Sequence, residues 1–233
     1  MDPDLLLGRL RRELGAFRAC LDDGHRSLSA PVTHCGEWTL HDLAAHLGRG
    51  NLWAAAAVTE GHGGLRPPPA PGEPAALARW FDGTCAVLLD ALAADPSAPA
   101  WTFHPPHTVG FWRRRRALET LVHRWDAEHA LGAARPLDPE TAGEGVAEVF
   151  DTMAPRQLAR GRARPPDRAV RLTATDTGAS WTYGPGTSAA TLSAPAERLL
   201  LVLWGRLPAD GGAVAWEGDR AAGLRVLAGP LVP

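Results

Sequence analysis

The chain has 233 residues, with 24 basic and 26 acidic side chains and a formal net charge of −2. Hydrophobic residues make up 45% of it and charged residues 21%, a composition typical of a soluble globular protein with one large domain or two smaller ones. A nearly neutral chain has no general attraction for nucleic acid or for an anionic membrane, so we expect neither as a partner.

The N-terminal segment lacks the features of an export signal. Residues 1–14 place acids where such a signal has a basic start, and their apolar side chains alternate with Arg and Glu. The sequence has no uncharged apolar run of about 18 residues, so we expect no membrane-spanning helix. Cys20, Cys35 and Cys85 lack the paired short spacing of a disulfide framework or a thiolate metal site, and we interpret them as reduced thiols. Together these features predict a cytoplasmic protein.

Apolar residues recur at three- and four-residue spacing along the first part of the chain, which is typical of amphipathic helices. Helices are predicted at about residues 4–22, 39–58, 75–94 and 109–131. Asp22, Asp23 and Gly24 should end the first of them. Thr39, with Asp42 three residues on, can form a reciprocal cap at the start of the second. This pattern predicts a four-helix bundle over residues 1–135.

The pattern changes in the last part of the chain. Asp138 followed by Pro139 is typical of a helix start, and we predict a helix to about Met153. The Arg- and Pro-rich segment 155–167 is interpreted as a surface linker. Short β-prone runs then predict strands near residues 169–175, 180–184, 190–194 and 213–218, with a helix over 195–207. Residues 136–233 are therefore expected to form a small α+β domain.

Three side chains on the second and fourth predicted helices could hold a metal ion. Glu119 and His123 are four residues apart, so they project from one face of their helix. His46 lies mid-helix and could meet them across the bundle core. Two imidazoles and one carboxylate leave positions of the metal open, as in a catalytic site. Asp126 and Asp42 could orient the two imidazoles, although solvent-facing acids or helix caps would give the same spacing.

Two sequence patterns surround these residues. WTLHDLAAHL at residues 38–47 and RALETLVHRWD at residues 116–126 resemble the mycothiol-dependent maleylpyruvate isomerase family, within the DinB-like metalloenzymes. LLLVLWGR at residues 199–206 is similar to the signature of that family's last domain. The resemblance implies an α+β fold, with an N-terminal DinB-like four-helix bundle and a small C-terminal α+β domain.

The resemblance also implies a ligand set and a reaction. His46, Glu119 and His123 occupy the positions at which the family binds a divalent metal, which we expect to be zinc. Arg116 matches the family pattern and could face inward to pair with a buried acid. Mycothiol would be the thiol cosubstrate, and its thiolate would attack an electrophilic small molecule, giving either cis–trans isomerisation or an S-conjugate. The chain contains neither Lys nor Ile, which indicates a gene rich in G and C and agrees with an actinobacterial thiol.

Two other classes of function remain open. A thiol-independent metal hydrolase would use the same ligands with water in the open position, and a non-catalytic regulatory module would bind metal for stability or sensing. Most of the Arg run at residues 113–116 is expected on a solvated helix face. Cys35 is not expected to be the nucleophile, because no base and orienter are evident near it. The sequence leaves open the choice between monomer and homodimer, the native metal, and the roles of His34, Cys35, His41, His104 and His107.

Overall fold

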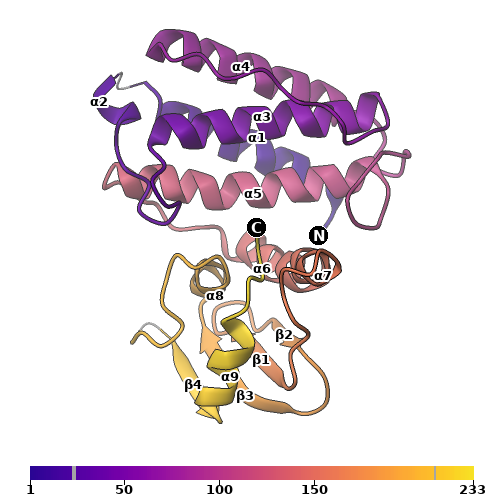
Figure 1. Ribbon diagram of the computed structural model, residues 1–233, viewed down its shortest axis with the longest axis vertical. Coiled ribbons are helices and arrows are strands. Elements are labelled where there is room, and N and C mark those ends of the chain that lie inside the picture. The colour runs from indigo at the N-terminus through magenta and orange to yellow at the C-terminus, as the bar shows by residue number, and fades with distance from the viewer. Residues whose placement is uncertain (23–24, 213) are drawn as a thin grey trace. The chain divides into compact units, whose positions relative to one another are not determined.

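The computed structural model describes residues 1–22, 25–212 and 214–233 (Figure 1). The chain divides into two units, Met1–Pro136 and Leu137–Pro233. The first is helical, and the second combines helices with a sheet, so the predicted α+β fold is confirmed. None of the helices in the described ranges has the length and apolar character that crossing a bilayer requires.

The N-terminal unit is built on four helices that pack in a ring. They are α1 (Pro3–Ala19), α3 (Leu40–Thr59), α4 (Pro74–Ala91) and α5 (Val109–Ala130). α1 packs against α5 and α4, and α3 packs against the same two helices, which closes the bundle (Figure 1). A short helix, α2 (His25–Leu28), precedes α3. The pairing of α3 with α5 brings the two predicted ligand-bearing helices into contact.

The start of α3 follows the predicted capping pattern. The hydroxyl of Thr39 accepts from the backbone N–H of Asp42, and the Asp42 carboxylate accepts from the backbone N–H of Thr39 at 2.9 Å. The predicted cap is therefore confirmed. α1 ends at Ala19, earlier than predicted, because the Cys20 N–H turns back onto the carbonyl of Phe17. Of the expected terminating residues, Asp22 lies in the turn after the helix, where its N–H donates to the carbonyl of Ala19 at 3.3 Å, and Asp23 and Gly24 lie outside the described part of the chain.

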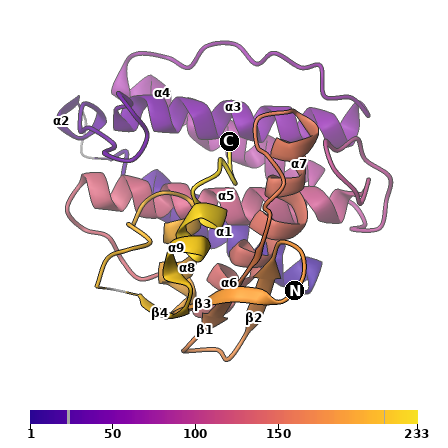
Figure 2. The same cartoon turned by 60° about the horizontal axis from the view of Figure 1, so that its bottom comes forward.

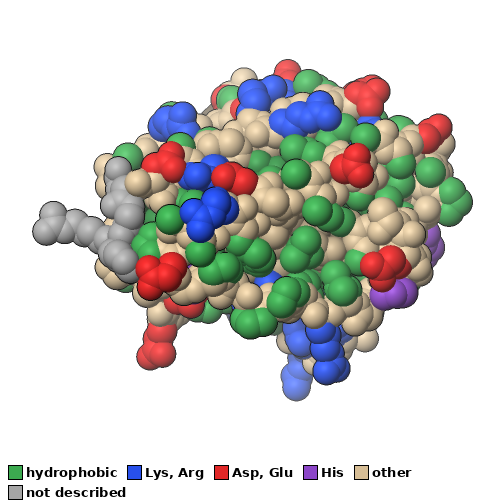
Figure 3. Space-filling model, turned by 90° about the horizontal axis from the view of Figure 1, so that it is seen from above, with side chains coloured by type: hydrophobic (Ala, Val, Ile, Leu, Met, Phe, Trp, Pro, Cys, Tyr) green, Lys and Arg blue, Asp and Glu red, His purple; other side chains and the backbone are tan. Residues whose placement is uncertain are grey.

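Aromatic and aliphatic side chains fill the bundle. Phe17 and Phe81 pack with ring centroids 5.1 Å apart in the core. Figure 2 shows the long connection between α3 and α4 running along the bundle. Trp53 donates to the carbonyl of Gly63 at 3.0 Å, which ties this connection to α3. From the α4 side, hydrophobic side chains gather in the middle of the face and charged side chains surround them (Figure 3).

The C-terminal unit has a sheet of order β2-β1-β3-β4 in its described part. Its strands are β1 (Ala169–Ala174), β2 (Ser180–Tyr183), β3 (Ser188–Ala194) and β4 (Ala215–Gly218). β1 and β3 pair in parallel at the centre, and β2 and β4 pair antiparallel at the edges. The helices are α6 (Pro139–Glu148), α7 (Ala154–Ala159), α8 (Ala196–Leu203) and α9 (Arg220–Leu227). α8 and α9 both pack against the two central strands.

Two features of this unit differ from the sequence expectation. The helix that begins after Asp138 does not end near Met153, since a π-helical turn, η1 (Val149–Met153), leads directly into α7. The first residues of the expected linker are therefore helical. The wider turn lets the N–H of Ala154 bond to the carbonyl of Val149, just before a proline that has no N–H to donate. α9 was not expected, although Asp219 caps it through the N–H of Ala222 at 3.0 Å.

Candidate metal centre

α3 and α5 bring the three predicted ligands together. His46, Glu119 and His123 each offer one donor atom, and these atoms all lie within 4.8 Å of one another. Nε2 of His46 is 3.2 Å from Oε1 of Glu119. The two imidazole rings are nearly perpendicular, at 82°, with centroids 5.2 Å apart. The three potential metal-ligating atoms are therefore close enough together to bind one ion.

The local sequence explains this convergence. Glu119 and His123 share a face of α5 because they are one turn apart. α3 approaches that face closely at Gly50, where a Cβ atom would come within 2.6 Å of Nη1 of Arg116. A larger residue at Gly50 would therefore displace the guanidinium group that contacts Glu119. The glycine makes the close contact between the two helices possible.

His123 is oriented by Asp126. Nδ1 of His123 lies 2.9 Å from Oδ2 of Asp126, and both side chains are buried. Burial lowers the pKa of His123, more than the neighbouring Asp126 carboxylate raises it, so the ring is neutral at neutral pH. With Nδ1 as the donor to Asp126, Nε2 carries the lone pair that can bind a cation. Asp42, the other candidate orienter, instead caps α3.

Glu119 is held in its ionised form by arginines. Its Oε2 accepts from Nη1 of Arg116 at 2.7 Å, and Nε of Arg115 lies 3.5 Å from the same oxygen. Burial favours the protonated acid, but Arg116 and Arg115 outweigh it and hold the pKa of Glu119 well below its usual range. Arg116 is fixed in turn by the side-chain oxygen of Asn51 at 2.8 Å and by the carbonyl of Leu47 at 3.2 Å. Arg116 thus faces the interior and pairs with the partly buried Glu119.

The donor set fits a divalent cation of borderline softness such as zinc. It combines a carboxylate that is ionised with a buried imidazole that is neutral, and these are the protonation states that ligation requires. The atoms that would not bind the ion already have partners, Arg116 on Oε2 of Glu119 and Asp126 on Nδ1 of His123. Exposure falls from 36% for the His46 side chain to 18% for Glu119 and 6% for His123. A small molecule would therefore approach the set from the His46 side.

The other histidines considered from the sequence make polar contacts with loop residues or pack against aromatic rings. Nε2 of His41 lies 3.0 Å from the carbonyl of Pro71, and Nδ1 of His107 lies 2.6 Å from Oγ1 of Thr102. The carbonyl of His104 accepts from the same threonine hydroxyl at 2.6 Å. The His34 ring lies 6.0 Å from the Trp125 ring and 5.5 Å from the His129 ring.

The Arg run at residues 113–116 is mostly buried, so the expectation of a solvated helix face is wrong. Arg113, Arg115 and Arg116 are each no more than 3% exposed. Arg113 donates to the carbonyls of Leu92 and Ala94 at 2.9 Å, at the C-terminal end of α4, where a cation is favoured. Burial is possible because α5 packs against helices on both of its sides.

Cys35 lies closer to charged partners than the sequence indicated. Its Sγ donates to Oδ2 of Asp126 at 3.8 Å, and Asp126 is the residue that orients His123. Burial raises the pKa of the Cys20 thiol to about 11 and that of the Cys85 thiol to about 12. No spacing pattern indicated the group formed by Cys35, His123 and Asp126, since Cys35 lies in a loop far from α5 in the sequence.

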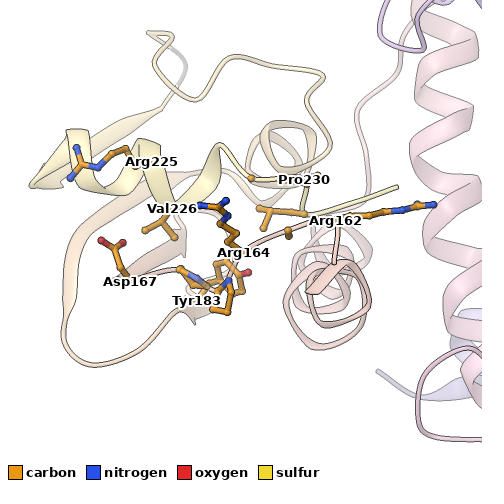
Figure 4. Close-up of a pocket in the computed structure, with 12 residues that line it drawn as sticks. Arg162, Arg164, Asp167, Tyr183, Arg225, Val226 and Pro230 are labelled. Carbon is orange, nitrogen blue, oxygen red and sulfur yellow. The ribbon is translucent and has the colours of Figure 1, made fainter. Parts of the chain in front are cut away.

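Sequence reasoning also missed a cavity in the C-terminal unit. It has a volume of about 380 Å³ and lies between residues 162–167 and the segment 225–231 (Figure 4). Arg164 and Tyr183 lie near its centre, while the Arg225 side chain points away (Figure 4). Tyr183 stacks on Phe150 with ring centroids 5.1 Å apart, and burial raises the pKa of its phenol. The predicted metal ligands do not line this cavity.

The bundle with its two histidines and glutamate, followed by a small α+β unit, defines a DinB-like protein. Residues 7–128 match the mycothiol maleylpyruvate isomerase N-terminal domain, and residues 140–225 match the C-terminal domain of the same family. The chain therefore belongs to the mycothiol maleylpyruvate isomerase family. The family predicted from the sequence is confirmed, and so is the prediction of an enzyme.

Individual proteins and solved structures are also similar to this chain. An uncharacterized protein of Mycobacterium tuberculosis, found in two strains, is 31% identical over 169 residues, which span 70% of this chain and 85% of the relative. Crystal structures of the mycothiol-dependent maleylpyruvate isomerase and of a histidine-to-alanine mutant have the same fold. Their TM-scores are 0.69 and 0.67, their identities 15% and 14%, and each alignment covers 93% of both chains.

Proposed function

We propose that this protein is a metal- and mycothiol-dependent enzyme that adds the thiolate of mycothiol to an electrophilic small molecule. The observation that carries the proposal is the convergence of His46, Glu119 and His123 in a chain of this family. We expect zinc, for which two imidazoles and one carboxylate are ordinary ligands, and this donor set leaves a further coordination position open. The bound metal would supply a Lewis acid that keeps a thiol deprotonated at neutral pH.

The chain's own residues prepare this chemistry. Arg116 and Arg115 keep Glu119 ionised, and Asp126 keeps the lone pair of His123 on Nε2. The exposed edge of His46 leaves room for the thiol to enter, beside the Trp38 ring, whose centroid lies 5.0 Å from that of His46. The arginines and Asp126 thus set the protonation states of two metal ligands, and the exposure of His46 provides the path by which the thiol enters.

The expected reaction begins with thiolate addition to an activated alkene. The sulfur forms a bond to one alkene carbon, and the electron pair of the double bond moves onto the activating carbonyl. Rotation about the former carbon–carbon double bond, now single, followed by loss of the thiolate, regenerates the alkene in the other configuration. Protonation in place of thiolate loss leaves a thioether conjugate, so isomerisation and conjugation share their first step.

Turnover with and without thiol tests the proposal. The metal-loaded protein is mixed with a cis-configured activated alkene such as maleylpyruvate, in the presence and absence of mycothiol, and isomerisation is followed by absorbance. We expect turnover only with mycothiol, and loss of turnover in His123→Ala. Hydrolytic activity without thiol would instead identify a metal hydrolase. Metal binding without activity or thiol binding would identify a non-catalytic module.

A further inference from the structure

A second group of metal-binding side chains lies beside the first. Cys35, His123 and Asp126 each offer a ligand atom, and these atoms all lie within 4.8 Å of one another. Sγ of Cys35 is 3.8 Å from Oδ2 of Asp126, which is 2.9 Å from Nδ1 of His123. His123 therefore belongs to both groups, with Nδ1 directed toward the second.

The loop that carries Cys35 is fixed by backbone hydrogen bonds. Pro31 and Thr39 pair as an antiparallel bridge at its base. The N–H of Val32 donates to the carbonyl of Trp38 at 2.8 Å, and the N–H of Cys35 donates to the carbonyl of Val32 at 2.9 Å. These hydrogen bonds fix the backbone of the loop and so place the Cys35 sulfur beside α5.

We propose that Cys35, His123 and Asp126 form a second cation site, which takes a thiophilic divalent cation in competition with the first site. A thiolate, an imidazole and a carboxylate are all ordinary zinc ligands. Bond lengths of 2.0–2.3 Å put the ligand atoms of a tetrahedral ion roughly 3.3–3.7 Å apart. The observed separations of 3.8 and 2.9 Å bracket this range, so small side-chain shifts would close the site.

Competition follows from the chemistry of His123. A neutral imidazole has a lone pair on only one of its two nitrogens. Coordination through Nδ1 moves the ring proton to Nε2, the nitrogen that would serve the first site. Cys35 loses its proton on binding, and the Asp126 carboxylate changes from hydrogen-bond acceptor to ligand. Soft cations such as Cd²⁺ favour the site with sulfur, whereas harder ones favour the site with Glu119. This second site needs no mycothiol and does not depend on the proposed reaction.

Cobalt titration of the full-length apoprotein without added thiol tests the site. A cobalt ion bound by Cys35 gives a sulfur-to-cobalt charge-transfer band, which the first site cannot give. We expect the band in the wild type, a severalfold stronger band in Glu119→Ala, and its loss in Cys35→Ser. Cys35→Ser should still bind one cobalt, seen in the ligand-field absorption. Cys85→Ser is the matched control and should keep the band.

Three results would overturn the proposal. They are a missing band in both the wild type and Glu119→Ala, a band that persists in Cys35→Ser, and a band abolished by Glu119→Ala in a variant that is folded by circular dichroism. The last result would make Cys35 a ligand of a single shared ion. None of them bears on mycothiol turnover, so failure here is distinct from failure of the proposed function.

Discussion

Nδ1 of His123 lies 2.9 Å from Oδ2 of Asp126, with 5% of the histidine and 1% of the aspartate exposed. A buried carboxylate in this position fixes both the tautomer and the orientation of the ring. Because burial also lowers the pKa of His123, the ring is neutral at neutral pH. The pair thus prepares Nε2 as a ligand before any ion binds.

Replacing Asp126 should weaken metal binding. In Asp126→Asn the ring loses its charged acceptor, and we expect zinc affinity to fall about 10- to 100-fold with little change in helical content. Isothermal titration of the apoprotein with zinc measures this. The control is Asp42→Asn, which alters the cap of α3 and should leave zinc affinity near that of the wild type. Equal affinity in Asp126→Asn and the wild type would show that Asp126 does not support the ligand.

Removing any of the three proposed ligands should remove the metal. We expect His46→Ala, Glu119→Ala and His123→Ala, each made in a Cys35→Ser background that removes the second site, to lose bound zinc while keeping near wild-type helical content, because the ligands project from helices packed by a separate apolar core. Metal analysis of the purified variants and circular dichroism give the two readouts. His41→Ala, on the same helix as His46, is the control and should retain zinc. Full metal content in any two of the three ligand variants would refute the triad.

Local signals made much of the fold predictable from the sequence. Thr39 and Asp42 fix the start of α3 by hydrogen bonds within four residues, and the spacing of Glu119 and His123 sets their common face on α5. The meeting of these two residues with His46 depends on helix packing, so spacing alone left it open. The family pattern supplied that long-range relationship.

Features that depend on tertiary packing were not predictable. Burial of Arg113 depends on carbonyls at the end of α4, far away in the sequence. The π-helical turn before α7 leaves no mark in the spacing of apolar residues. The short helix α9 begins two residues after β4 ends, so its residues were not separated from the strand in the sequence. The proximity of Cys35 to Asp126 joins residues 91 positions apart.

Cys20 and Cys85 should be unreactive thiols in the folded protein. Burial raises the pKa of Cys20 to about 11 and that of Cys85 to about 12, so at pH 8 both are protonated and react slowly as nucleophiles. We expect Cys35→Ser, which keeps only these two thiols, to react slowly with a reagent such as dithionitrobenzoate at pH 8 and quickly after denaturation. Bound zinc or cadmium at the second site should protect Cys35. Fast labelling that survives in Cys35→Ser would contradict the assignment.

The N-terminal unit should bind metal by itself. All proposed ligands precede Pro136, where the two units divide. We expect a chain of residues 1–136 to be helical and to bind one zinc ion with an affinity near that of the full chain. Circular dichroism and zinc titration check this, with His123→Ala in the same short chain as the control. A folded short chain that does not bind zinc would mean that the C-terminal unit supplies a ligand.

The central claim is that a metal held by His46, Glu119 and His123 binds the sulfur of mycothiol. The most direct test is the absorption spectrum of cobalt-substituted protein in which Cys20, Cys35 and Cys85 are all replaced by Ser, recorded before and after mycothiol is added at neutral pH. Without protein thiols, any sulfur-to-cobalt charge-transfer band must come from the added ligand. We predict no band before addition and a saturable band after it, absent when His123→Ala is combined with the cysteine replacements. A cobalt-loaded protein that shows no band at saturating mycothiol would contradict the claim.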